Sequence, residues 1–244
     1  MTENKIVLVT GANKGIGYEI AAQLKTLGAT VIIGARDDRR REEAAKALGV
    51  ESVALDVTDA TTVEKAAAWI DEHFGRLDAL VNNAGITGGW GQEPSKVAPE
   101  LIRKVFDTNS FGVITVTNAM LPLLRKSAAA RIVNMSSGVG SLAQQQNDGI
   151  YTGLPPAAAY PVSKTALNSL TVQYTKDLSK AGILVNAVCP RLLRDRPQRP
   201  SRTPHGRPRR GDRGEARDAR SRRLDRRLFQ RRRPVALVGL TWST

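Results

Sequence analysis

Residue types that build metal sites and disulfide frameworks are nearly missing from this 244-residue chain. It contains one cysteine, Cys189, and two histidines, His73 and His205. A lone cysteine excludes an internal disulfide framework and a cysteine-cluster metal site. Two histidines so far apart in the sequence do not indicate a zinc site. The sequence therefore predicts no metal centre.

Long apolar segments are also missing. No apolar run approaches the roughly 20 residues that a membrane helix needs. The first residues, MTENKIVLVTG, lack the basic region and cleavable apolar segment of a signal peptide. We therefore expect a cytoplasmic protein with no membrane partner.

Lysine is absent from residues 191–244, which contain 18 arginines and five acidic residues. This region supplies +13 of the formal net charge of +14, so residues 1–190 are nearly neutral. We predict one domain over residues 1–190 and a disordered Arg/Pro-rich tail over residues 191–244.

Short apolar runs alternate with amphipathic segments along the first 190 residues. Near-continuous apolar runs are typical of parallel strands that are covered on both faces. The predicted strands are 5–11, 29–36, 50–57, 77–85, 130–137 and 183–190. The predicted helices are 16–27, 40–48, 59–74, 100–125 and 158–180, with Thr58 or Asp59 as the cap of the third. The alternation predicts an α/β fold, a doubly wound parallel sheet with right-handed crossovers.

A glycine-rich turn follows the first predicted strand, in TGANKGIG, where Gly11, Gly15 and Gly17 open a helix. Glycine permits a tight turn and close backbone approach, and the amides at a helix start attract a pyrophosphate. The GxxxGxG spacing departs from the GxGxxG fingerprint of dinucleotide sites. The glycines alone leave both a cofactor site and a simple turn open.

The spacing resembles that of the short-chain dehydrogenase/reductase family, whose glycine motif reads TGxxxGxG. Further family motifs follow in order: LDV with Asp56, NNAG at 82–85, TNSFG with Asn109, VNMSS ending at Ser137, and YPVSK at 160–164. The chain is identified as a member of this family over residues 1–190, which implies a Rossmann-type fold. TGANKGIG, GAR and the long serine-to-tyrosine connection are most similar to carbonyl reductases.

Tyr160 and Lys164 stand at i and i+4 of a predicted helix, so the ammonium can lie near the phenol. A phenol with a pKa of about 10 is a poor acid–base catalyst near pH 7, and a nearby cation can lower that pKa. An arbitrary YxxxK would be a surface tyrosine beside a solvated lysine, but its place between the fifth and sixth strands favours catalysis. The resemblance implies that Tyr160 is the general acid and that Lys164 also holds the nicotinamide ribose.

The resemblance implies two further catalytic residues. Ser137 would hydrogen-bond the substrate carbonyl, and Ser136 is the structural alternative that closes a strand. Asn109 would hold a water in a proton relay to Lys164, or would only contact a helix kink. Tyr151 is a second tyrosine in this region but is not expected to be the general acid, because no lysine follows it at i+4. The long connection, residues 138–156, covers one side of the substrate site or is a solvated insertion.

Two basic residues favour NADP(H) as the cofactor. Lys14 and Arg36 can reach a 2′-phosphate, whereas an NAD site would favour an acidic residue where Ala35 stands. Asp37 is a counter-signal, although ARD is similar to the pattern of NADPH-using carbonyl reductases. The resemblance implies these cofactor-binding residues: Gly11, Asn13, Lys14, Gly15, Ile16, Gly17, Arg36, Asp56, Val57, Asn83, Ala84, Gly85, Tyr160 and Lys164.

We therefore expect an oxidoreductase that transfers hydride between NADP(H) and an aldehyde or ketone, as a monomer or homodimer. One alternative is a folded but inactive nucleotide-binding protein. Another is a protein whose basic tail binds nucleic acid. The tail offers charge but few aromatic residues and no zinc spacing, so no specific nucleic acid is expected as a partner.

The tail begins where the family has a Pro-Gly-x-x-x-Thr loop, and here Pro190 is followed by Arg191. Codons exist for residues 191–199 that, read one base later, encode Gly-Tyr-Cys-Ala-Thr-Asp-Leu-Asn-Gly and restore this loop. The same shift over residues 225–234 permits a sequence similar to the last strand of such reductases. Because arginine has GC-rich codons and lysine has not, we interpret the tail as a frameshifted GC-rich reading frame. The sheet would then lack its last strand, and activity would be impaired.

Overall fold

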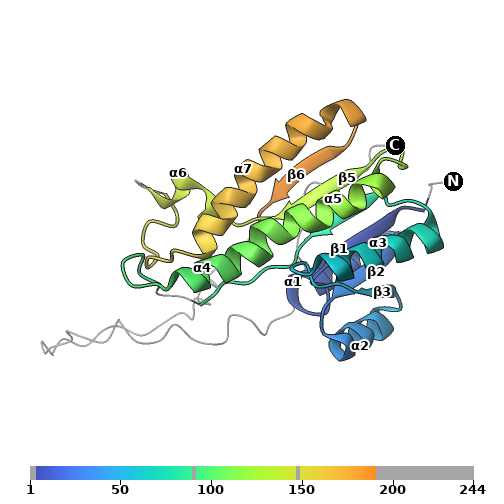
Figure 1. The fold of residues 1–244 in the computed structure, drawn as a ribbon, viewed down its shortest axis with the longest axis horizontal. Coiled ribbons are helices and arrows are strands. Elements are labelled where there is room, and N and C mark those ends of the chain that lie inside the picture. The colour runs from blue at the N-terminus through green and yellow to red at the C-terminus, as the bar shows by residue number, and fades with distance from the viewer. Residues whose placement is uncertain (1–3, 90–91, 147–148, 191–244) are drawn as a thin grey trace, which may run out of the picture. The chain divides into compact units, whose positions relative to one another are not determined.

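A parallel sheet lies between two layers of helices in the structure, which is a computed structural model (Figure 1). It describes residues 4–89, 92–146 and 149–190. The sheet order in this part of the chain is β3–β2–β1–β4–β5–β6. The strands are β1 (Ile6–Thr10), β2 (Thr30–Ala35), β3 (Glu51–Ala54), β4 (Ala79–Asn82), β5 (Arg131–Met135) and β6 (Leu184–Val188). The predicted doubly wound, Rossmann-type fold is confirmed.

The helices also follow the prediction, with one interruption and one short helix, at residues 142–145, that was not predicted. They are α1 (Gly15–Thr26), α2 (Asp38–Leu48), α3 (Ala60–Phe74), α4 (Pro99–Phe106), α5 (Gly112–Leu124), α6 (Leu142–Gln145) and α7 (Tyr160–Leu178). The predicted helix over 100–125 is divided into α4 and α5 by a π-helical turn, Asp107–Phe111. Of the two capping candidates for α3, Asp59 is the cap, since its side chain accepts a hydrogen bond from Thr61 N.

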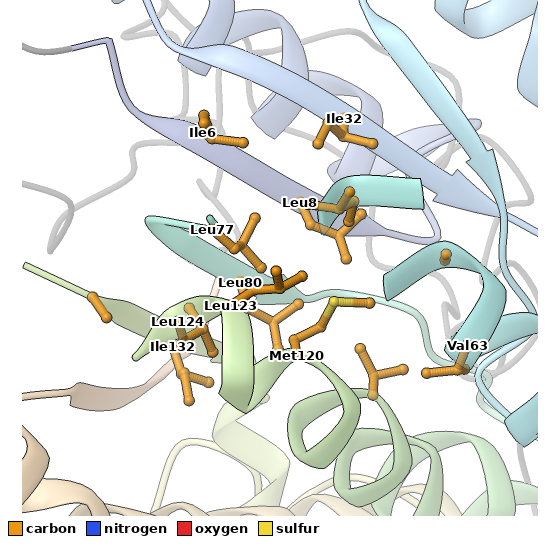
Figure 2. Close-up of a cluster of buried hydrophobic side chains, with 14 of the residues drawn as sticks. Ile6, Leu8, Ile32, Val63, Leu77, Leu80, Met120, Leu123, Leu124 and Ile132 are labelled. Carbon is orange, nitrogen blue, oxygen red and sulfur yellow. The ribbon is translucent and has the colours of Figure 1, made fainter. Parts of the chain in front are cut away.

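One apolar layer fills the space between the sheet and helices α3, α5 and α7. Figure 2 shows strand side chains such as Leu8 and Leu80 meeting Met120 of α5 in this layer. All three side chains are fully buried. At about 25 cal/mol for each Å² of apolar surface, removal of such side chains from water stabilises the packing of α5 on the sheet.

The second apolar layer lies under α1 and α2 on the opposite face. Val7 and Val9 of β1 pack here with Ile20 and Leu24 of α1. Leu8, between the two valines, faces the first layer, so β1 is apolar at each of its first four positions and ends in the polar Thr10. Burial on both faces thus explains why the strands show continuous apolar runs and no polar alternation.

β6 is the last strand of the sheet in the described residues, and it is less covered than the inner strands. Val185 is buried against α7, whereas Leu184 is 51% exposed. The predicted tail, residues 191–244, lies outside the described residues. Its interpretation as disordered and frameshifted therefore stays a prediction. In the described part, no helix is both long enough and apolar enough to cross a membrane.

Candidate active site

The predicted site residues lie where the parallel strands end, at one edge of the sheet. The sheet order reverses direction between β1 and β4, so their carboxyl ends border a topological switch point. Ligands of open α/β sheets bind outside such a point, because the loops that follow the two strands diverge there. The glycine turn follows β1, and the NNAG loop follows β4.

The three glycines of the first turn are needed for two different reasons. Gly11 and Gly15 have φ angles of +63° and +60°, in the left-handed region that favours glycine. Gly17 is needed for space, since a Cβ there would lie 2.8 Å from Gly11 O. A Cβ at Gly11 would also lie 2.8 Å from Ala84 Cα. The turn is therefore packed too closely for a side chain at Gly11 and Gly17, whereas Gly15 is required by its positive φ alone.

The start of α1 is open toward solvent. Lys14 precedes the helix and makes no side-chain capping hydrogen bond to it. Lys14, Gly15 and Ile16 are exposed, and Asn13 is half-buried. The first amides of a helix have no partner within the helix, and the helix dipole gives this end partial positive charge. The arrangement suits a bound pyrophosphate.

Asn83 fastens the glycine turn to the NNAG loop. Its Nδ2 donates to Thr10 O at 2.9 Å and to Gly11 O at 3.2 Å. In return, Thr10 Oγ1 accepts from the backbone amides of Asn83 and Ala84, at 3.0 and 3.1 Å. The side chain of Asn83 thus supports the turn. Thr10 was not among the predicted site residues, although its place at the end of β1, next to the glycine turn, could have indicated it.

The other asparagine of NNAG, Asn82, belongs to a buried polar chain beneath the site. Asn82 Nδ2 donates to Thr117 Oγ1 at 3.1 Å and to Asn134 Oδ1 at 2.9 Å. Asn134 Nδ2 then donates to Thr171 Oγ1 at 2.9 Å. Buried polar groups that hydrogen-bond to one another favour a single packing arrangement. This series of side-chain hydrogen bonds therefore holds β4 and β5 in place against α5 and α7. This network explains why the motif contains two asparagines.

Asn109 lies in the π-helical turn and is fully buried. Its Oδ1 accepts from Ile86 N at 2.9 Å, and its Nδ2 donates to Ile86 O at 2.9 Å and to Ser163 Oγ at 3.0 Å. The amide therefore fixes the loop after β4 and the start of α7 to the turn. The contact at the helix kink is present, and the water relay stays a prediction.

Tyr160 and Lys164 lie together in the first turns of α7, as their spacing predicts. Lys164 Nζ is 5.7 Å from the centre of the Tyr160 ring. The ammonium is buried and donates to Met135 O, at the end of β5, at 2.7 Å. Gly85 lies beside it, since a Cβ there would be 3.7 Å from Lys164 Nζ and 3.3 Å from Asn109 Oδ1. The ends of β4, β5 and α7 thus converge on one place.

Burial controls the charge of this pair. It lowers the pKa of Lys164 to about 8. It raises the pKa of Tyr160, against the opposing effect of a hydrogen bond with Ser137, and Cys189 raises the pKa further. Burial thus outweighs the part of the lowering that Lys164 was expected to supply, and the net shift of the phenol's pKa is upward. Near pH 7, the site pairs a neutral phenol with an ammonium.

The two serines after β5 point to different partners. Ser136 is buried, and its Oγ donates to Asn168 Oδ1 of α7 at 2.5 Å. Ser137 is half-buried and interacts with the Tyr160 hydroxyl. The geometry therefore brings Ser137 to the phenol and gives Ser136 a structural contact.

The two serines should respond differently to alanine. Ser137→Ala should lower kcat/KM for a carbonyl substrate about 10- to 100-fold, because a donor to the developing oxyanion is lost. Ser136→Ala should leave kcat/KM within a few-fold but lower the free energy of unfolding by about 1–2 kcal/mol, because Asn168 loses its partner. Steady-state kinetics and urea unfolding of both variants measure this. The reverse pattern would assign the carbonyl contact to Ser136.

Charged residues lie at the ends of β2 and β3. Arg36 Nη1 is 3.8 Å from Asp56 Oδ2, and its side chain is 73% exposed. Asp37 accepts a hydrogen bond from Arg40 N at the start of α2, which lowers the pKa of its carboxyl. Because Asp37 caps this helix, its carboxylate is engaged in a structural contact. At the end of β2 the Arg36 side chain is the more exposed of the two, 73% against 43% for Asp37.

Asp56 and Val57 also have structural contacts. Asp56 Oδ1 accepts from Thr58 N at 3.0 Å and from Thr58 Oγ1 at 2.7 Å. Val57 is buried, and a Cβ on Gly112 would lie 2.8 Å from its Cγ2. The segment after β3 is thereby fixed against the start of α5. Its predicted contact with the adenine end of a cofactor stays a prediction.

Comparison with known proteins agrees with this geometry. The sequence pattern described as short chain dehydrogenase matches residues 5–203. The chain belongs to the short-chain dehydrogenase family. It is accordingly an oxidoreductase of the hydride-transferring kind, and the predicted membership is confirmed. The match ends at residue 203, beyond the predicted boundary at 190.

Three relatives illustrate the similarity of this short-chain dehydrogenase. Short-chain dehydrogenase/reductase 1 of Saponaria officinalis is 34% identical and aligns over 80% of this chain and 83% of its own length. The solved structure of salutaridine reductase from Papaver somniferum matches with a TM-score of 0.67 and 31% identity, over 77% of this chain and 86% of that one. The RhlG/NADP active-site complex of Pseudomonas aeruginosa matches with a TM-score of 0.67 and 33% identity, over 76% and 72%.

Proposed function

We propose that this short-chain dehydrogenase transfers hydride between NADP(H) and an aldehyde or ketone, with Tyr160 as the general acid in reduction. The convergence of Ser137, Tyr160 and Lys164 at the edge that bears the glycine turn supports this proposal. A carbonyl placed beside Ser137 and the phenol would meet two hydroxyl donors. The salutaridine reductase relative is, by its name, also a reductase.

The residues of the glycine turn fit a dinucleotide. The close packing at Gly11 and Gly17 keeps side chains out of the turn, and the uncapped start of α1 faces solvent. We propose that the pyrophosphate binds there and that Tyr160 and Lys164 hold the nicotinamide end. When bound, NADPH supplies the hydride that adds to the carbonyl carbon. The NADP in the matched RhlG complex supports this choice of cofactor.

The protein supplies the proton. As the carbonyl carbon gains the hydride, its oxygen becomes negative and takes the proton from Tyr160 Oη, so the product is a neutral alcohol. Burial keeps the phenol protonated near pH 7, the form that reduction needs. The Lys164 ammonium, beside the ring, stabilises the phenolate that remains.

Lys14 and Arg36 should set the preference for the phosphorylated cofactor. Replacing both with alanine should raise the KM for NADPH about 10- to 100-fold and leave the KM for NADH within about threefold, because charge-assisted contacts to the 2′-phosphate are lost. Lys46→Ala is the matched control, since Lys46 lies in the last turn of α2, at the end of the helix opposite Arg36. Initial rates with each cofactor give both values, and equal changes for NADPH and NADH would contradict the assignment.

The proposed activity is tested by the loss of NADPH absorbance with a panel of aldehydes and ketones. The chain as written is compared with a copy whose residues 191–234 are restored to the alternative reading frame. Turnover by both chains would show that the first 190 residues suffice. Turnover by the restored copy alone would show that the present tail impairs a reductase. NADPH binding without turnover by either chain would overturn the proposed reductase.

A further inference from the structure

Tyr151 lies next to the proposed carbonyl site, although its sequence context excluded it as the acid. A Cβ built on Gly138 would lie 2.7 Å from Tyr151 Cζ, so the ring covers the residue that follows Ser137. Gly138 N donates to Cys189 Sγ at 3.0 Å. Cys189 in turn lies near enough to Tyr160 to raise the pKa of that phenol. Tyr151 and Cys189 therefore border the same turn as Ser137 and Tyr160, the two proposed hydrogen-bond donors to the carbonyl.

The segment that contains Tyr151 is folded back on itself. Tyr151 N donates to Gln144 O at 3.1 Å, and Leu154 N donates to Tyr151 O at 3.1 Å. Gln145 Nε2 donates to Val139 O at 2.7 Å, which ties α6 to the turn after β5. The Tyr151 backbone is thus held on both sides while its half-buried ring rests on Gly138.

In its described residues, 138–146 and 149–160, the same segment carries no charge, and Asp148, its one acidic residue, lies outside them. Three of its large apolar side chains are exposed: Leu142 at 61%, Ile150 at 72% and Leu154 at 48%. Exposed apolar side chains on a segment that contacts the turn after Ser137 favour an apolar ligand, because binding can remove them from water.

We propose that Tyr151 is a specificity-determining residue whose ring contacts an apolar, ring-sized group on the carbonyl substrate. This inference rests on the proposed reductase activity and adds its substrate class. The contact is made by the aromatic ring, so phenylalanine should replace tyrosine at this position. The affinity for a substrate without the apolar group should not depend on the Tyr151 ring.

The test uses two α-branched aldehydes of similar reactivity, cyclohexanecarboxaldehyde and isobutyraldehyde. Tyr151→Ala should raise the KM for the cyclohexyl compound about tenfold, with kcat within about threefold and the KM for isobutyraldehyde unchanged. Tyr151→Phe should keep both KM values. Gly138→Ala, whose methyl group would occupy the position of the ring, should reproduce the cyclohexyl effect. Leu27→Ala, an exposed apolar truncation at the end of α1, is the control for general effects.

A second measurement does not depend on turnover. Cys189 is the single cysteine of the sequence and is exposed, so its alkylation rate reports on occupancy of the adjacent site. With NADP⁺ present, cyclohexanecarboxamide should slow alkylation by iodoacetamide in the unsubstituted chain and in Tyr151→Phe, and not in Tyr151→Ala. Isobutyramide should slow the alkylation of Cys189 only slightly, and to the same extent in all three proteins.

The two proposals fail in different ways. Equal KM changes for both aldehydes, or a loss confined to kcat, would overturn the role of Tyr151 and leave the reductase intact. If the unsubstituted chain reduces neither aldehyde, the proposed activity fails for this pair, and the protection experiment decides the role of Tyr151. Identical protection in Tyr151→Ala and the unsubstituted chain would then overturn it.

Discussion

Replacement of Tyr160 by phenylalanine should lower kcat for carbonyl reduction about 10²- to 10⁴-fold, the usual contribution of a positioned general acid. The ring is retained, so its packing beside Lys164 Nζ, 5.7 Å from the ring centre, should persist. The Kd for NADPH should therefore stay within a few-fold. Initial rates give kcat, and quenching of protein fluorescence by NADPH gives the Kd. An intact kcat would remove Tyr160 from the mechanism.

Tyr151→Phe is the matched control, because it removes the same hydroxyl from a ring at the same site. It should leave kcat within about twofold, since Tyr151 is proposed to act through its ring. If both variants lost kcat equally, the two phenols could not be assigned different roles. The direction of the reaction adds a second distinction between them. Because burial raises the pKa of Tyr160, alcohol oxidation, which needs the phenolate, should accelerate as pH rises, while reduction should slow.

The architecture of the molecule could be predicted because it follows from local patterns. Each apolar run became a strand, and the inner strands are covered on both faces, as β1 shows with its five buried residues. Gly11 and Gly15 could be placed because a positive φ requires glycine at defined points of a turn. Tyr160 and Lys164 came together because their spacing fixes them on one face of α7. In each case the information lies within a few residues of sequence.

Contacts between distant segments could not be read in this way. Asn82 and Asn134 are 52 residues apart, and their hydrogen bond depends on the register between β4 and β5. Nothing in the periodicity near Asn109 showed the π-helical turn, because apolar spacing does not reveal one extra residue in a helix. The contact of Tyr151 with Gly138 depends on a tertiary arrangement in which Tyr151 N donates to Gln144 O. Tertiary packing decides these features. It also decides the direction in which the pKa of Tyr160 shifts from its ordinary value.

Lys164 should make stability depend on pH in a direction that follows from its burial. Below about pH 8 the amine is protonated in both the folded and the unfolded chain, and the folded chain holds a buried charge. Above that pH the folded chain releases the proton, whereas the unfolded chain keeps it up to the ordinary pKa of 10.5. The unfolded state then binds more protons, so the free energy of unfolding rises with pH.

Each pKa unit corresponds to about 1.4 kcal/mol, so the rise amounts to about 3 kcal/mol between the folded and the unfolded pKa. It is limited at the upper end, because Tyr160 and Tyr174 have raised pKa values when folded. Their unfolded phenols ionise first, near pH 10, and stability falls again there. The informative window thus runs from about pH 8 to about pH 10.

Lys164→Met should abolish this rise and, at the same time, most of the reductase activity. Urea unfolding at intervals across the window measures the difference in slope between the two proteins. Lys176→Met, which removes an exposed lysine from the same helix, should retain the rise. Near pH 7 two effects oppose each other in Lys164→Met, because loss of the buried charge stabilises while Met135 O loses its donor. The slope is therefore the sharper measure, and an unchanged slope would show that the ammonium remains hydrated in the folded protein.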